Sequence, residues 1–237
     1  MLKYVTLTGA DDSVTDQDEM FRLSEEFPFV EWGILVASST GHRFPSLDWI
    51  KALVEKNVKR DVRMNLSLHI CGMRLREIMA GRSTLLDTYT GFAAFQRCQL
   101  NFHGDRCGDV GEQILRAFCF MEPWEPQIIF QFDRVNESLI NAAGRRFPVA
   151  ALFDESHGAG QLPEEWRQSL PDYPCGYAGG LGPQNVAAEL SRIIPKTYPA
   201  QGFWIDMETR LYTDGKFDLG KCRSVLEQAA PFVEATA

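Results

Sequence analysis

The amino-acid sequence predicts a (β/α)8 barrel, the TIM-barrel fold. Short β-rich segments alternate strictly with helix-like segments, the alternation counts eight of each, and the last segment is a helix. The length of 237 residues is close to the roughly 250 typical of this fold. An open doubly wound sheet is the competing fold, but it usually has fewer strands. No linker, low-complexity tract or shift in composition interrupts the chain, so we expect one domain over residues 1–237.

The eight predicted strands are apolar on both faces or nearly so, as expected of parallel strands that are covered on both sides. Turn residues separate most of them from the segments that follow. In chain order, the strands are predicted over residues 3–9, 29–37, 62–70, 97–104, 126–133, 148–155, 175–181 and 202–208.

In the helix-like segments, apolar residues recur at intervals of three and four, which places them on one face of a helix. Ser46 stands directly before the second of these segments and is a candidate N-cap. Residues 81–96 fit the alternation least well, and we expect them to extend the third helix or to cover the bottom of the barrel. The helices are predicted over residues 16–27, 46–57, 72–81, 109–121, 136–146, 162–170, 183–194 and 218–235.

Composition excludes several classes of protein. No apolar run approaches the roughly 20 residues of a membrane-spanning helix, and the N-terminus has no signal-peptide pattern, so we expect a cytoplasmic protein that does not bind membranes. A net charge of -8 argues against nucleic acid as a partner, although a local pocket can still bind a small anion. The six cysteines form no C-x-x-C pair, which argues against a zinc ribbon or a disulfide framework. We predict no cofactor and no bound metal, and the sequence predicts no oligomeric state.

Polar residues gather where the predicted strands end, which is where barrels of this class carry their chemistry. The four histidines lie at or just after strand ends and indicate a polar rim that faces a ligand. They lack the H-x-H and H-x-x-x-H spacings that build many metal sites. These histidines are His42, His69, His103 and His157.

Two aspartates also end strands. Asp154 follows four apolar residues, where a carboxylate is costly unless it is solvated, paired or used. Asp206 ends the last strand and is followed by Glu208. Arg43, in the loop after the second strand, is the cation best placed to point into the barrel mouth.

The stretch "CGYAGGLGPQNVAAEL" places Gly179 and Gly180 between the seventh strand and a helix expected to begin near Pro183. Such a turn is consistent with a simple tight bend that needs glycine for a positive φ. It also lets backbone N–H groups approach a ligand at the positive end of a helix. Because many barrels hold phosphate beside their seventh and eighth strands, we expect a phosphate site here.

Five motifs of this sequence resemble those of the phosphoribosylanthranilate isomerase family, the barrel of the tryptophan pathway. The resemblance spans most of the chain and is strongest in the last 90 or so residues. "AGGLGPQNV" is the most specific piece. The motifs are "GHRFPS" at 41–46, "QLNFHGDR" at 99–106, "ALFDESHGAGQL" at 151–162, "AGGLGPQNV" at 178–186 and "IDMETRLYTDGKFDLGKCRSVLE" at 205–227.

The resemblance implies an Amadori-type rearrangement of an N-linked 5-phosphoribosyl amine, with Asp154 as the acid and Arg43 holding the aromatic part of the substrate. The substrate would be a small phosphorylated sugar amine. The remaining residues expected at the substrate are His69, His103, His157 and Asp206. Those expected at its phosphate are Gly158, Gly160, Gly179, Gly180 and Arg210.

Two positions depart from the family pattern. Thr8 stands where the family has its catalytic base, a cysteine, and a hydroxyl is far too weakly acidic to replace it unaided. Glu208 falls in the loop of the eighth strand that holds phosphate, where it would repel the ligand unless Arg210 compensates. Cys71, which follows the third strand, is the candidate replacement base, with His69 and His103 as further candidates.

Two other functions remain open at this point. The first is a barrel that binds a phosphosugar but has lost catalysis, which Thr8 and Glu208 favour. The second is a metal-assisted aldolase or hydrolase that uses the histidine rim with Asp154 and Asp206.

Overall fold

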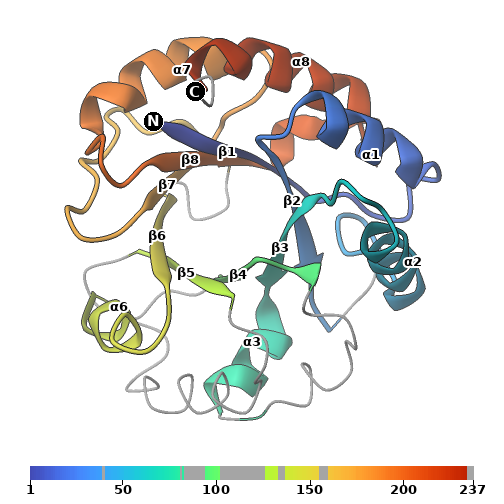
Figure 1. Ribbon diagram of the computed structural model, residues 1–237, viewed down its shortest axis with the longest axis horizontal. Coiled ribbons are helices and arrows are strands. Elements are labelled where there is room, and N and C mark those ends of the chain that lie inside the picture. Colours follow the sequence, from blue (N-terminus) through green and yellow to red (C-terminus); the bar gives the residue numbers. More distant parts are fainter. Residues whose placement is uncertain are drawn as a thin grey trace.

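The computed structural model of the chain describes residues 1–38, 41–80, 82, 94–101, 126–132, 137–154 and 160–233. Its eight parallel strands form a closed ring in sequence order, so the predicted barrel is confirmed (Figure 1). All eight strands lie within the predicted segments or one residue beyond them. They are β1 (Leu2–Thr8), β2 (Val30–Val36), β3 (Asn65–Ile70), β4 (Arg97–Leu100), β5 (Gln127–Gln131), β6 (Val149–Asp154), β7 (Cys175–Ala178) and β8 (Phe203–Met207).

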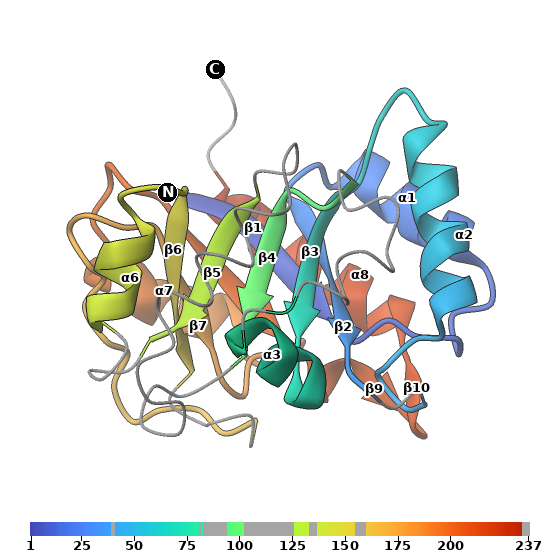
Figure 2. The ribbon, with the colours of Figure 1, turned by 90° about the horizontal axis from the view of Figure 1, so that it is seen from below.

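The ring closes where β1 pairs with β8. Thr6 is the residue at which this seam is easiest to follow, since it is in register with Glu31 on one side and Asp206 on the other. Because all strands run in the same direction, their C-terminal ends meet at one end of the barrel, which is the lower end in Figure 2.

The described helices lie outside the ring (Figure 1). Asp16, Ser46 and Asp218 each cap the N-terminus of a helix by accepting a backbone N–H, so the predicted cap at Ser46 is confirmed. None of the described helices has the length and apolar character that a bilayer-spanning segment requires. The helices are α1 (Gln17–Glu26), α2 (Leu47–Val58), α3 (Gly72–Met79), α6 (Glu137–Ala143), α7 (Val186–Ile193) and α8 (Leu219–Ala229).

Short elements complete the described chain. A two-stranded hairpin and three 3-10 turns were not predicted from the sequence. They are η3 (Ile194–Lys196), η4 (Thr209–Leu211), β9 (Tyr212–Thr213), β10 (Lys216–Phe217) and η5 (Ala230–Phe232).

The helix predicted over residues 162–170 is wrong, because this segment crosses from β6 to β7 without any helix. Trp166 explains the conformation. Its buried indole packs edge-on against Tyr177 with ring centroids 5.9 Å apart, and its Nε1 donates to Glu189 Oε2 at 2.8 Å. One large anchored side chain therefore fixes the crossing. The helix predicted over residues 109–121 lies outside the described residues.

Helix α7 begins at Val186, three residues later than the predicted start. The side chain of Asn185 holds the preceding turn, because its Oδ1 accepts from the Gly182 backbone N–H and its Nδ2 donates to the Gly180 carbonyl, both at 2.9 Å. The Asn185 side chain closes this turn beside the first helical hydrogen bond, which the Val186 backbone N–H donates to the Gly182 carbonyl at 3.0 Å.

The barrel interior holds a buried polar cluster beside an apolar one, so the prediction that the strands are apolar on both faces is wrong for part of the inward face. Arg97 Nη1 reaches Glu31 Oε1 at 2.8 Å, between strands that are not neighbours, and Thr6 Oγ1 donates to the same oxygen at 2.8 Å. Arg97 also stacks 4.0 Å above the ring of Trp204. Since all four side chains are almost fully buried, an ion pair occupies the centre of the barrel beneath the mouth.

Candidate functional site

A cavity of about 400 Å³ opens at the C-terminal ends of the strands. Ten of the predicted site residues line it, which places most of the predicted set together. His103, His157 and Gly158 lie outside the described residues. The ten lining residues are Thr8, Arg43, His69, Cys71, Asp154, Gly160, Gly179, Gly180, Asp206 and Arg210.

Asp206 is the most perturbed acid of the cavity. It is 5% exposed, and its Oδ1 accepts a 2.7 Å hydrogen bond from Thr8 Oγ1. Burial raises the pKa of Asp206 to about 7, the Thr8 bond opposes this rise, and the negative charges of Glu208, Glu31 and Asp154 add to it. The carboxyl group is therefore poised to gain or lose a proton near neutral pH.

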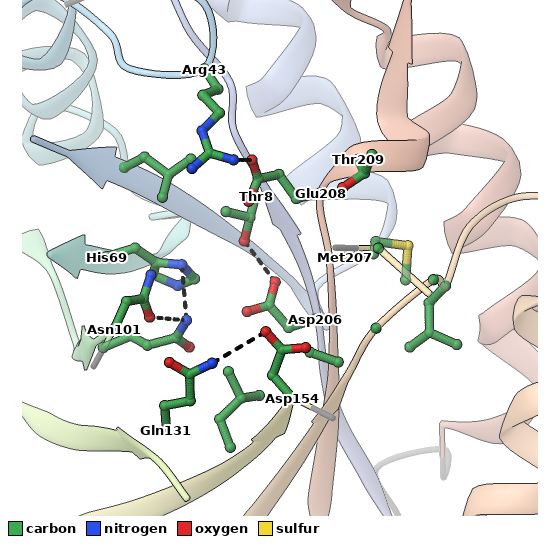
Figure 3. A pocket seen from close by; sticks show the side chains of 18 of the residues that line it. Thr8, Arg43, His69, Asn101, Gln131, Asp154, Asp206, Met207, Glu208 and Thr209 are labelled. Carbon is green, nitrogen blue, oxygen red and sulfur yellow. Dashed lines mark hydrogen bonds and ion pairs between the residues drawn. The ribbon is translucent and has the colours of Figure 1, made fainter. Parts of the chain in front are cut away.

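Asp154 ends β6 and points into the same cavity, where Figure 3 shows its carboxyl group next to that of Asp206. Gln131 Nε2, from β5, donates to Asp154 Oδ2 at 3.2 Å. The negative charge of Asp154 is one of the causes of the raised pKa of Asp206, so two carboxyl groups from different strands act in one cavity.

His69 forms part of a polar wall with Gln99 and Asn101. Gln99 Nε2 lies 3.3 Å from His69 Nδ1 and donates to Asn101 Oδ1 at 2.9 Å. Because Nε2 of Gln99 is a donor, His69 Nδ1 accepts and the ring proton resides on Nε2. Burial, aided by the charge of Arg97, lowers the pKa of His69 to about 3. His69 is therefore a neutral donor, and its buried Nε2 has no partner among the described residues.

Cys71 follows β3 and receives a 3.1 Å hydrogen bond at Sγ from Asn101 Nδ2. Burial raises the pKa of this thiol to about 11, against the opposing effect of the Asn101 bond. The thiol is therefore protonated at neutral pH, which makes Cys71 a poor base in this environment.

Arg43 and Glu208 form an ion pair within the cavity mouth, with Nη1 and Oε1 2.6 Å apart (Figure 3). The Arg43 backbone N–H donates to Asp11 Oδ2 at 2.6 Å, and this holds Arg43 at a φ of 67°. The stem of Glu208 passes beside Gly9, where an added Cβ would lie 3.4 Å from Glu208 Cγ. Glu208 is thus directed toward Arg43 and the end of β1.

Gly179 and Gly180 have φ values of 116° and 63°, so the turn after β7 requires glycine for its backbone alone. A Cβ at Gly180 would also lie 2.6 Å from the backbone nitrogen of Leu162. The turn nevertheless lines the cavity, and the Arg210 side chain packs over Gly182 nearby. The tight-bend interpretation is confirmed, and it is compatible with a phosphate site at the same turn.

Two of the four histidines of the predicted rim are described, and only His69 of these two lines the cavity. His42 is exposed and stacks on Tyr212, with ring centroids 4.8 Å apart, and it does not line the cavity. Within the described ranges, no group of three or more His, Cys, Asp and Glu side chains is arranged to hold a metal ion.

Sequence reasoning missed Gln99, Asn101 and Gln131 as site residues, although all three line the cavity. A signal was available. Gln99 and Gln131 are polar residues at inward positions of β4 and β5, and Asn101 continues the alternation from Gln99.

No protein-family model matches the sequence, and no curated protein matches it either. Solved structures do match. TrpF from Jonesia denitrificans superposes with a TM-score of 0.55 at 15% identity, covering 96% of each chain. Phosphoribosyl anthranilate isomerase from Thermococcus kodakaraensis gives 0.54 at 14%, covering 96% of this chain and 99% of that one. A phosphoribosyl anthranilate isomerase in complex with reduced 1-(o-carboxyphenylamino)-1-deoxyribulose 5-phosphate gives 0.53 at 15%, covering 98% and 100%. At this identity, the likeness shows a shared fold.

Proposed function

We propose that this chain isomerises an N-linked 5-phosphoribosyl amine to the corresponding 1-deoxyribulose amine by acid–base catalysis. The observation that carries the proposal is the pair of carboxyl groups, Asp154 and Asp206, in one cavity with a glycine turn suited to phosphate. The shared fold supports it, since one matching isomerase binds a phosphorylated analogue of this kind. The cytoplasm is the compartment we expect for such an enzyme.

The reaction needs one group that gives a proton and one that takes a proton. The acid protonates the ribose ring oxygen, so the ring opens to a Schiff base. The base removes the proton from C2, and the resulting enolamine becomes the ketone. The two carboxyl groups of the cavity can divide these roles between them.

We assign the acid to Asp154 and the base to Asp206. Thr8 has no usable acidity, but its hydroxyl orients Asp206 by a 2.7 Å hydrogen bond, so Thr8 is a positioning residue. A carboxylate with a pKa of about 7 is a stronger base than an ordinary aspartate, which suits removal of a carbon-bound proton. Cys71, with its raised pKa, loses its role as the candidate base.

The remaining cavity residues bind and orient. Backbone groups of Gly160, Gly179 and Gly180, with Arg210, are proposed to hold the phosphate. His69, whose Nε2–H has no partner among the described residues, is proposed to donate to a sugar oxygen. Because the imidazole of His69 stays neutral, it does not take up the proton that Asp206 removes from the substrate.

The test is whether the full chain converts phosphoribosylanthranilate or related phosphoribosyl amines. Conversion is monitored as the disappearance of the substrate amine. Asp154→Asn and Asp206→Asn should each reduce kcat by about 100-fold or more, as removal of a general acid or base does. Asp172→Asn, at an exposed position outside the cavity, is the matched control and should keep full activity. Absence of turnover with every amine, or an Asp154→Asn variant as active as the parent, would sink the proposal.

A barrel that binds phosphosugars without catalysis is the second candidate, and Thr8 at the end of β1 favours it. Calorimetry separates the two, because this candidate requires binding of a phosphosugar without conversion. The metal-assisted alternative has no supporting cluster among the described residues.

A further inference from the structure

The Arg43–Glu208 ion pair is part of the cavity lining, and this bears on which substrates the cavity accepts. The side chains of Arg43 and Glu208 are 39% and 26% exposed, so both remain accessible to a ligand from the mouth. Their positions are fixed from two sides. The Arg43 backbone is bound by Asp11, and the Glu208 stem packs beside Gly9. A ligand therefore meets a preformed pair rather than two independent charges.

The described charged side chains that line the cavity form three groups. Arg210 packs over Gly182 at the glycine turn, where we place the phosphate. Arg43 carries the other positive charge, and Glu208 already balances it at 2.6 Å. Asp154 and Asp206 add negative charge between these regions. A second anionic group on the substrate would thus displace Glu208 from Arg43 and leave its carboxylate unpaired, at a cost.

The ion pair also offers hydrogen bonds of both kinds. One guanidinium N–H is donated to Oε1 of Glu208. Oε2 of Glu208 is a further acceptor, and the other N–H groups of Arg43 are further donors. A primary carboxamide presents the complementary N–H and carbonyl oxygen, whereas a carboxylate presents acceptors alone.

We infer that the amine part of the substrate carries an uncharged group that both donates and accepts hydrogen bonds, such as a carboxamide, and that Glu208 selects it over a carboxylate. This inference rests on the proposed function and defines its substrate class more closely. Glu208 here acts as a specificity residue rather than as a catalytic one.

The test uses two unreactive ligands that differ at one group. They are the reduced 1-(arylamino)-1-deoxyribulose 5-phosphates that carry an ortho-carboxamide or an ortho-carboxylate. Calorimetry with the full chain at pH 7 should give about 10-fold tighter binding of the carboxamide, which is the scale of one like-charge contact at a partly exposed site. Glu208→Gln, which keeps the shape and an oxygen acceptor but removes the charge, should abolish or reverse this preference.

Glu165→Gln is the matched control, because Glu165 also pairs with a cation, Lys196, but lies on the surface and outside the cavity. It should leave the preference of the parent unchanged. Equal binding of the two ligands by the parent, or tighter binding of the carboxylate, overturns the inference and leaves the proposed function standing. Failure of both ligands and of ribose 5-phosphate to bind overturns the proposed function and the inference with it. If Glu208→Gln does not fold, the comparison of the two ligands on the parent still decides.

Discussion

Thr8 Oγ1 donates a 2.7 Å hydrogen bond to Oδ1 of Asp206, across the seam at which β1 and β8 close the barrel. The bond links a side chain that cannot ionise near neutral pH to a carboxyl group whose pKa burial raises to about 7. Thr8 stands where the resemblance would place the catalytic base, and it is hydrogen-bonded to Asp206, which can take up a proton near neutral pH. In our proposal, the base therefore lies on the last strand rather than on the first.

Asp206→Asn should stabilise the folded chain at pH 8. The folded-state pKa is about 7, against 3.8 for an unperturbed aspartate. Between these values the folded state holds a proton that the unfolded state has lost, so parent stability falls as pH rises from about 4 to about 7. About three pKa units correspond to roughly 4 kcal/mol as an upper scale. Asparagine removes this penalty and can still accept from Thr8.

Denaturant unfolding of both proteins at pH 4 and pH 8 measures the effect. We expect the gain to be large at pH 8 and small at pH 4. A gain independent of pH, or a loss at pH 8, would show that Asp206 ionises in the fold as easily as in the unfolded chain.

The activity of the parent should rise as pH rises through about 7. Asp206 must be ionised to remove the proton from C2, and its carboxyl group ionises with a pKa of about 7. Below that pH the base is largely protonated and inactive. The profile of kcat/KM against pH measures this limb, and a rate that falls between pH 6 and pH 7 would contradict the assignment of Asp206 as the base.

Thr8→Val should move the same limb to higher pH. The hydrogen bond from Thr8 lowers the pKa of Asp206, so its loss lets that pKa rise by about one unit. Thr197→Val is a matched control, because the exposed Thr197 hydroxyl donates to the Ile194 carbonyl and to no carboxyl group among the described residues. An unshifted limb in Thr8→Val, with activity otherwise retained, would remove Thr8 as a positioning residue.

The fold was predictable because strand and helix periodicity are local properties of the sequence. For the histidines, by contrast, the sequence predicted a place at the strand ends. It did not predict whether each side chain points into the barrel or away from it. His42 stacks outward on Tyr212 while His69 points into the cavity. The distinction depends on loop conformation, which periodicity does not encode.

The polar interior escaped prediction for a related reason. The residues next to Glu31 and Arg97 in the sequence give no sign of an ion pair, and 66 positions separate the two partners. Only closure of the ring makes them partners. The pKa of Asp206 likewise depends on Thr8, which lies 198 positions away. Long-range pairs of this kind decide the chemistry of the site, and no local pattern reveals them.

Cys71→Ala should retain kcat/KM within a few-fold. Burial raises the pKa of this thiol to about 11, so the thiolate is scarce at neutral pH and contributes little as a base. Steady-state kinetics of the variant measure the effect, and parent protein treated with a thiol alkylating agent gives a second comparison. A loss of 100-fold or more in Cys71→Ala, with unfolding unchanged, would restore Cys71 as the base and displace Asp206.

Glu31→Gln should destabilise the fold by about 3–5 kcal/mol, because it leaves the charge of Arg97 buried without a counter-ion. Both side chains of this pair are almost fully buried, at 1% and 4% exposure. Glu19→Gln is the matched control. It removes one of the two carboxylate partners of Arg22, in an exposed pair at 2.6 Å, and should cost at most about 1 kcal/mol. Denaturant unfolding at pH 7 measures both variants.

Glu31→Gln also tests whether the charge of Glu31, at the barrel centre, affects the pKa of Asp206 in the cavity. The negative charge of Glu31 contributes to the raised pKa of Asp206, so its removal should lower that pKa and move the limb on which activity rises to lower pH. Thr8→Val shifts the limb in the opposite direction, which makes the two variants mutual controls. A Glu31→Gln protein that is destabilised but keeps the parent limb would confine the buried ion pair to a structural role. A limb that moves upward would contradict the electrostatic account of Asp206 itself.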